Sequence, residues 1–185
     1  MELIGTVVAL QVQRSRLKPL PAKLYDPAAL APVAALEVGP RGGTGITADG
    51  ERVLDVHHAD HPDSRNRRLA NGVSLMSLDA YTALRQRYGD HLVDGIAGES
   101  LLLDGVLPVT GQVVLETGEG ELRLTAVQPI PPCVGFTCFC LRRAGLDTDD
   151  EVLTTLEALG GGARGCASPV VGAGVVHVGA RLWRA

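Results

Sequence analysis

The chain has 185 residues, of which 45% are apolar, and a formal net charge of −4. A chain of this length can bury a sufficient core without disulfides, so we expect one domain over residues 1–185. The acidic balance argues against a nucleic-acid-binding protein, because phosphate-binding surfaces are normally basic. No apolar run approaches the roughly 20 residues of a membrane helix, and the N-terminus lacks the pattern of a signal peptide. We therefore expect a cytoplasmic protein without a nucleic acid or a membrane as partner.

The first third of the sequence predicts strands joined by irregular connections. β-Branched residues favour a strand over residues 3–13, and the prolines of residues 14–32 exclude a regular element throughout that segment. In chain order, the next expectations are a strand over 33–38, a glycine-rich loop or hairpin over 39–51, a returning strand over 52–58 and a polar loop over 59–72.

The clearest helix is predicted over residues 77–89, directly after a short strand over 73–77. Ser77 suits the N-cap, and Gly89 ends the apolar periodicity. From residue 92 to residue 128, short apolar runs alternate with glycine turns, which predicts strands and a hairpin through Gly118 and Gly120.

A second helix is predicted after the cysteines, where Thr148 and Glu151 fit a capping box and Gly160 fits the stop. Residues 175–183 are predicted to close the chain as a strand or bent hairpin. Short strands at close spacing favour a mainly β fold, namely a closed or nearly closed mixed barrel with two or three peripheral helices.

Three of the four cysteines lie in the stretch PIPPCVGFTCFC, residues 129–140. Without a secretion signal, free thiols are expected. The spacing of Cys133, Cys138 and Cys140 matches no standard zinc motif, although three thiolates with Cys166 or a histidine could still form a tetrahedral site. Cys138 and Cys140 lie among aromatic residues and are expected to pack in the core. Cys133 follows two prolines, so a rigid turn could direct its thiolate into a cavity, where it could ligate a soft metal or carry sulfur.

Polar segments supply further candidate ligands. His57, His58 and His61 are interspersed with aspartates, a pattern that suits either a metal site or a solvated loop. The guanidinium groups of Arg65, Arg67 and Arg68 are suited to binding an anion, because they can contact phosphate oxygens bidentately.

Two glycine-containing segments could approach a ligand closely. Gly98 and Glu99 lie between a glycine turn and an apolar strand. Between residues 160 and 165, glycine amides and the charge of Arg164 could hold a phosphate, although neither a Walker loop nor a Rossmann fingerprint is present.

Taken in order, these segments resemble the MOSC family, which is found at the C-terminus of molybdenum cofactor sulfurases and as stand-alone bacterial proteins. The segments that carry the resemblance are VSLMSLDAYTAL (73–84), LVDGIAGESLLLDG (92–105), GQVVLETGEGELRLTAVQPIPPC (111–133) and GGGARGCASPVVGAGVVHVGARL (160–182).

The resemblance implies a barrel of the pyruvate-kinase type, in which the cysteine of the Pro-Cys motif, here Cys133, ligates molybdenum in a pterin cofactor or carries a persulfide. A small-molecule substrate and a separate electron-donor protein or a cysteine desulfurase are the implied partners. The residues expected to bind the molybdenum cofactor (molybdopterin) are Arg65, Arg67, Arg68, Gly98, Glu99, Ser100, Arg164 and Gly165, and Lys18 is a further candidate for its phosphate.

The sequence departs from the family at two of these motifs. Ser100 stands where the family usually has asparagine, and Ala180 stands where it usually has aspartate. Three hypotheses follow: a molybdenum-dependent enzyme that reduces N-hydroxylated compounds, a sulfur carrier that uses Cys133 without metal, and a non-catalytic module with structural zinc at Cys133, Cys138 and Cys140.

Overall fold

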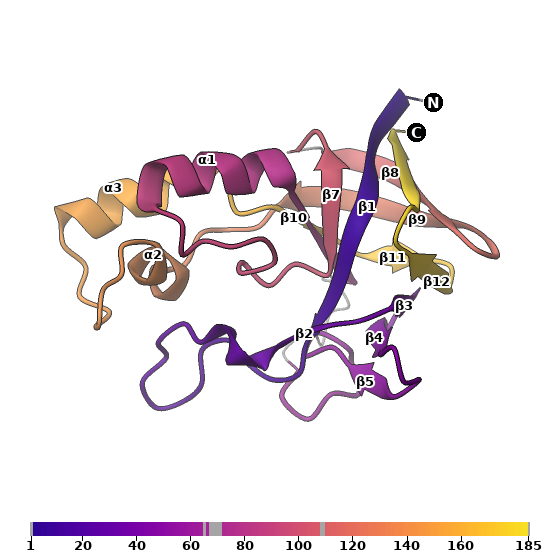
Figure 1. Ribbon diagram of the computed structural model, residues 1–185, viewed down its shortest axis with the longest axis horizontal. Coiled ribbons are helices and arrows are strands. Elements are labelled where there is room, and N and C mark those ends of the chain that lie inside the picture. Colours follow the sequence, from indigo (N-terminus) through magenta and orange to yellow (C-terminus); the bar gives the residue numbers. More distant parts are fainter. Residues whose placement is uncertain (1, 65, 67–71, 108–109, 185) are drawn as a thin grey trace.

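A computed structural model describes residues 2–64, 66, 72–107 and 110–184. The fold is mainly β, with a closed seven-stranded mixed barrel and three α-helices in the described part of the chain (Figure 1). The barrel strands are β1 (Glu2–Gln13), β6 (Val73–Ser77), β7 (Leu101–Gly105), β8 (Gly111–Thr117), β9 (Gly120–Pro129), β10 (Cys166–Ser168) and β13 (Arg181–Arg184).

The barrel closes because its strand order β10-β6-β7-β1-β13-β8-β9 ends on a strand that pairs again with β10. Every pairing around this ring is antiparallel except β6 with β7, which is parallel. A parallel pair requires a crossover connection, and helix α1 (Leu78–Tyr88) supplies it between β6 and β7. The predicted hairpin is confirmed as β8 and β9.

A smaller sheet with the order β12-β3-β4-β5 lies beside the barrel. Its strands are β3 (Ala35–Gly39), β4 (Gly42–Ile46), β5 (Arg52–Leu54) and β12 (Gly174–His177), while β2 (Leu30–Pro32) pairs with β1 and β11 (Val170–Val171) pairs with β9.

The smaller sheet bears on two predictions. Residues 39–51 were expected to form a loop or a hairpin, and the structure has the hairpin, because β4 pairs with β5. A Cβ on Gly45 would lie 2.5 Å from a methyl group of Val33, so glycine is required there for packing. The single strand or bent hairpin expected over 175–183 does not form, because β12 pairs with β3 whereas β13 joins the barrel between β1 and β8. The predicted strand over 52–58 is shorter than expected and ends at Leu54.

Helix α1 begins and ends as predicted, with the Ser77 hydroxyl accepting a hydrogen bond from the Ala80 amide at 3.2 Å and with Gly89 at φ 110°. Helix α3 (Asp150–Ala158) is capped by Asp149, whose side chain accepts from the Val152 amide, and not by Thr148 as predicted.

Helix α2 (Val134–Cys140) was not predicted from the sequence. Its residues have modest helix propensity, and tertiary packing stabilises it. Phe136 is fully buried, with its ring centroid 5.1 Å from that of Tyr25.

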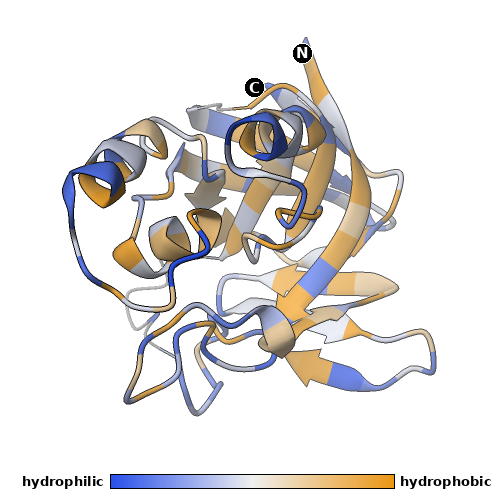
Figure 2. Cartoon of the chain, turned by 60° about the vertical axis from the view of Figure 1, so that its left-hand side comes forward, coloured by the Kyte–Doolittle hydropathy of each residue, from blue (hydrophilic) through white to orange (hydrophobic). Residues whose placement is uncertain are grey.

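The apolar core has two parts. One fills the barrel, and the other lies between α1, α2 and the end of the barrel, where Tyr81, Met76 and Phe136 are fully buried. Figure 2 shows mostly hydrophobic residues along β1, whereas α1 and α3 carry hydrophilic residues as well. Within the described ranges, no helix combines the length and apolar character needed to span a membrane.

Candidate functional site

Cys133 lies at the N-terminal boundary of α2, between two prolines and the helix, and its side chain is partly buried. The Lys18 ammonium donates to its sulfur at 3.4 Å and the Arg164 guanidinium donates at 3.2 Å. Gly135 makes room for Lys18, because a Cβ there would lie 2.9 Å from the lysine Cδ and 3.3 Å from a backbone oxygen. Three segments distant in sequence therefore converge on this thiol.

The electrostatic surroundings favour the thiolate of Cys133. Burial by itself would raise the pKa of this thiol, but Arg164, the Phe136 backbone N–H and Lys18 together outweigh burial and lower the pKa below its ordinary value. The other thiols of the motif behave differently: burial raises the pKa of Cys138, and it raises the pKa of Cys140 to about 12. Of the three thiols, Cys133 is thus the one whose surroundings favour the thiolate.

Arg164 precedes β10 and is held by contacts on several sides. Its Nη1 donates to the Pro131 carbonyl at 3.3 Å, and its guanidinium lies 5.0 Å from the ring centroid of Phe136. Its Nε is buried and has no partner in the described part of the chain. An unpaired buried donor is costly, so this atom is available for a ligand.

The glycines next to Arg164 do not form the expected phosphate cradle. Gly165 donates its amide to the Gly162 carbonyl at 2.8 Å. Its φ is +88°, and a Cβ on it would lie 2.3 Å from the Leu75 carbonyl oxygen, so the close backbone packing requires glycine. Gly160, Gly161 and Gly162 line a separate groove beside α1.

Glu99 lines a cavity of about 170 Å³ on the other side of Arg164, which we call the Glu99 hollow. Only 4% of Glu99 is exposed; its Oε2 accepts from the Tyr81 hydroxyl at 2.8 Å, whereas its Oε1 has no partner among the described residues. Burial raises the pKa of Glu99 to about 7, against the opposing effect of the Tyr81 hydrogen bond, and Asp94 contributes to the rise. The Glu99 hollow therefore contains a carboxyl group that exchanges its proton near neutrality.

The neighbours of Glu99 are held in place. Gly98 has φ +84°, and a Cβ on it would lie 2.5 Å from a methyl group of Leu17; its carbonyl accepts from Gln13 Nε2 at 2.5 Å. Ser100, at the position where the resembling family has asparagine, donates its amide to the Ser74 hydroxyl at 3.0 Å. The Ser100 hydroxyl also lies 3.3 Å from the Ser74 hydroxyl, so the serine side chain contacts β6 while the residue still lines the hollow.

A second cavity of about 390 Å³, the lysine hollow, adjoins the first. The two share Gln13, His57 and Arg164 as lining residues. Lys18, Lys23 and Arg16 also line the lysine hollow, so it is rich in positive charge. An anionic group is the ligand that such a surface favours.

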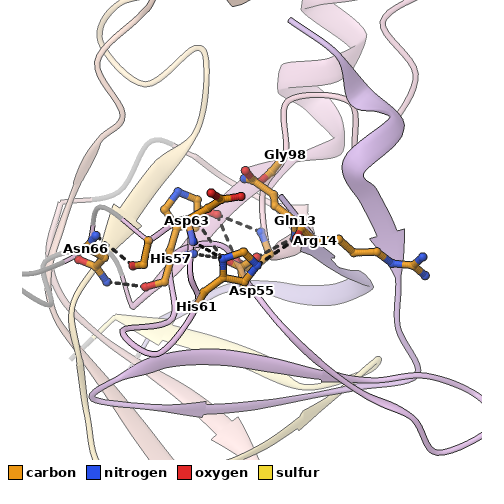
Figure 3. A network of polar contacts seen from close by, with 11 residues as sticks. Gln13, Arg14, Asp55, His57, His61, Asp63, Asn66 and Gly98 are labelled. Atoms are coloured by element: carbon orange, nitrogen blue, oxygen red, sulfur yellow. Dashed lines mark hydrogen bonds and ion pairs between the residues drawn. The ribbon is translucent and has the colours of Figure 1, made fainter. Parts of the chain in front are cut away.

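His57 lies on the shared wall of the two hollows and is held by Asp55 (Figure 3). Its Nδ1 and its backbone N–H both lie 2.8 Å from Asp55 Oδ1. Asp55 Oδ2 accepts from the Gln13 amide at 2.8 Å, and Asn66 donates to the His57 carbonyl at 2.9 Å. The proposed metal cluster of His57, His58 and His61 does not form, because the rings of His58 and His61 accept backbone N–H groups of their own turns.

The predicted site residues are only partly brought together. Cys133 and Arg164 are in contact, and Gly98, Glu99 and Ser100 line the adjoining hollow, whereas Ala180 packs against the barrel core. The predicted anion-binding residues Arg65, Arg67 and Arg68 lie outside the described residues.

Sequence reasoning did not single out Gln13 and Tyr81, which contact Gly98 and Glu99. Their signal was weak, since each is a single polar residue within or beside an apolar segment. The expectation of structural zinc finds no support: across the ranges the structure describes, no three His, Cys, Asp or Glu side chains are placed to hold a metal ion together. Cys133, Cys138 and Cys140 form no disulfide, as expected, and Cys138 and Cys140 are buried.

Searches with family models and with curated proteins find no match to this chain. Several solved structures are similar to this chain in fold. YuaD from Bacillus subtilis is 11% identical with a TM-score of 0.59, and the match covers 97% of this chain and 94% of YuaD. YiiM from Escherichia coli is 14% identical with a TM-score of 0.51, covering 99% and 69% of the two chains. YiiM from Geobacillus stearothermophilus is 18% identical with a TM-score of 0.53, covering 98% and 73%. This likeness supports the MOSC resemblance at the level of the fold.

Proposed function

We propose that this protein binds a molybdenum–pterin cofactor through the Cys133 thiolate and reduces N-hydroxylated compounds with electrons from a separate donor protein. The observation that carries the proposal is the Cys133 thiol, whose pKa is lowered despite burial because Arg164 and Lys18 face it. A soft thiolate is a suitable ligand for a soft metal centre.

The residues around this thiol fit the chemistry of such a cofactor. Oε1 of Glu99 and Nε of Arg164 have no partner among the described residues, so the first can accept from an N–H group of a pterin ring and the second can donate to an acceptor. The cations of the lysine hollow suit a terminal phosphate. When bound, the cofactor would supply a metal centre that passes two electrons to the substrate.

In this proposal, the protein's own residues stabilise the thiolate and orient the bound cofactor. Arg164 and Lys18 lower the pKa of Cys133 and so favour the thiolate form that a metal requires. Glu99 lines the Glu99 hollow and is held by the hydrogen bond from buried Tyr81, so its carboxyl group can orient a heterocycle. Gly98 allows the backbone of this segment to approach Leu17 and Gln13 closely.

The test is elemental and pterin analysis of protein made in a host shown to synthesise the cofactor. We expect about one molybdenum atom per chain, an oxidisable pterin, and reduction of an N-hydroxylated amidine when an electron donor is supplied. Cys133→Ser should lose metal and activity, whereas Cys138→Ala, a matched change of a buried thiol in the same motif, should retain both. Absence of both metal and pterin from the wild type would refute the proposal.

A sulfur carrier is the second candidate, and the cationic surroundings of Cys133 favour it independently of the hollows. The thiolate would attack the outer sulfur of a cysteine desulfurase persulfide, so that a new S–S bond forms on Cys133 and the desulfurase cysteine leaves as a thiolate. Mass spectrometry after incubation with a desulfurase and cysteine should show one added sulfur on the Cys133 peptide. No adduct on that peptide would exclude this candidate.

A further inference from the structure

The Asp55–His57 pair is built into the wall of the site, and the proposed cofactor contacts do not use it. Asp55 is 5% exposed and lies just after β5, and the His57 side chain is 38% exposed and lines both hollows. The pair thus joins a buried carboxylate to an imidazole that a ligand in either hollow can reach.

The hydrogen bonds decide which ring nitrogen faces the hollows. The 2.8 Å contact with Asp55 Oδ1 assigns the proton of neutral His57 to Nδ1. Nε2 then remains as an acceptor, and it has no partner among the contacts of the described residues. Protonation of Nε2 would give an imidazolium whose second N–H remains held by Asp55, which is the arrangement of a general acid.

The neighbouring histidines show that this arrangement is particular to His57. His58 uses Nδ1 to accept from the Asp60 amide at 3.2 Å. His61 uses Nδ1 to accept from the Asp63 amide at 3.0 Å and Nε2 to contact the Arg14 carbonyl at 2.9 Å. Those two rings stabilise turns, whereas Nε2 of the His57 ring remains available to a ligand in the hollows.

Across the two hollows, the other charged groups that line the walls are Arg16, Lys18, Lys23, Asp63, Glu99 and Arg164. Arg16 lies 3.9 Å from Asp63, and Lys18 and Arg164 face the Cys133 sulfur. Tyr25 also lines the lysine hollow, but burial raises the pKa of its phenol well above the ordinary value, so it stays protonated. Among the described residues, His57 is therefore the group that offers both hollows an unpartnered ring nitrogen, and Glu99 offers the Glu99 hollow an unpartnered carboxyl oxygen.

We propose that His57, oriented by Asp55, donates the proton that the leaving oxygen needs when the N–O bond of a bound N-hydroxylated substrate is cleaved. This role rests on the reduction proposed above. Two electrons from the donor protein and two protons convert R–NH–OH into R–NH₂ and water: the N–O bond breaks, one O–H bond forms with the proton from His57 Nε2, and one N–H bond forms with a proton from solvent. His57 then regains its proton from solvent through the open lysine hollow.

The first test needs no cofactor. Protein labelled with ¹⁵N-histidine, studied by NMR above the titration range of imidazole, should show His57 with its proton on Nδ1. Asp55→Asn should reduce the population of this tautomer. A wild-type spectrum with the proton on Nε2 would overturn the proposal.

The second test uses chemical rescue of the molybdenum-loaded protein. His57→Ala should lower kcat by about 100-fold or more with unchanged molybdenum content, and added imidazole should restore part of the rate. His177→Ala removes an exposed histidine on β12 and should leave the rate unchanged and insensitive to imidazole. A His57→Ala variant that is as active as wild type, or one whose loss imidazole does not restore, would overturn the role. A wild type without molybdenum would instead refute the proposed function, and this role with it.

Discussion

The burial of Glu99 can be tested directly, because ionising this buried carboxyl group should lower the free energy of unfolding by a measurable amount. The pKa of this carboxyl is raised from 4.5 to about 7, chiefly by burial. Each pKa unit corresponds to about 1.4 kcal/mol. Ionising Glu99 therefore costs the folded state about 3 kcal/mol more than it costs the unfolded state.

The sign of the pH dependence follows from proton binding. Between pH 4.5 and about 7, the unfolded state has lost this proton while the folded state retains it. Since the folded state binds more protons over this range, the free energy of unfolding falls as pH rises. The stabilising contribution is fully present below pH 4.5 and is lost once the pH has passed the folded-state value of about 7.

Glu99→Gln removes the charge and keeps the shape. Relative to wild type, the free energy of unfolding of this variant should rise by about 3 kcal/mol between pH 4 and pH 8, measured by urea unfolding at a series of pH values. Glu119→Gln makes the same change at an exposed position in the β8–β9 turn and should give a curve parallel to wild type. A Glu99→Gln curve that is also parallel to wild type would show that this carboxyl is not destabilised by burial, and would refute the reasoning.

Three further predictions concern the thiols and the close backbone packing. Arg164→Met should raise the pKa of Cys133 and slow its alkylation by iodoacetamide at pH 7, roughly tenfold for each pKa unit; an unchanged rate would contradict the electrostatic account. Gly165→Ala should destabilise the fold by more than about 2 kcal/mol, because its Cβ would overlap a carbonyl of β6, whereas Gly118→Ala, with open space around its Cβ, should cost less than about 1 kcal/mol in urea unfolding. Cys138→Ala should cost about 1–2 kcal/mol and leave the alkylation rate of Cys133 unchanged; equal stability would show that this buried thiol does not contribute to packing.

Local signals in the sequence were sufficient to predict several helix ends and turns. The cap at Ser77, the stop at Gly89 and the glycine turn between β8 and β9 each depend on neighbouring residues, and the structure confirms them. Helix α2 was missed because its stability comes from tertiary contacts: Phe136 packs against Tyr25, more than one hundred positions earlier. The periodicity of apolar residues along the sequence cannot reveal such a contact.

The site shows the same division between local and distant determinants. Sequence reasoning singled out Cys133 through its prolines and its resemblance to a family motif, and it separated this thiol from Cys138 and Cys140. It could not predict that the His57 ring contacts Asp55, or that Oε1 of Glu99 has no hydrogen-bond partner among the described residues. Both features depend on which residues the barrel brings close together. The spacing of these residues in the sequence does not distinguish them from those of an ordinary polar loop.

The residues of the candidate site lie in the connections between strands and helices. The chemistry of the site can therefore change while the barrel stays the same. Lys18 follows β1, His57 follows β5, Glu99 precedes β7, Cys133 precedes α2 and Arg164 precedes β10. The strands specify where these connections meet, but the connections themselves carry the charge and the thiol. A shared barrel at 11–18% identity is therefore compatible with a different ligand or reaction. The two proposed functions differ in the group that Arg164, which contacts Cys133 and lines both hollows, would serve: a metal cofactor in one and a persulfide in the other.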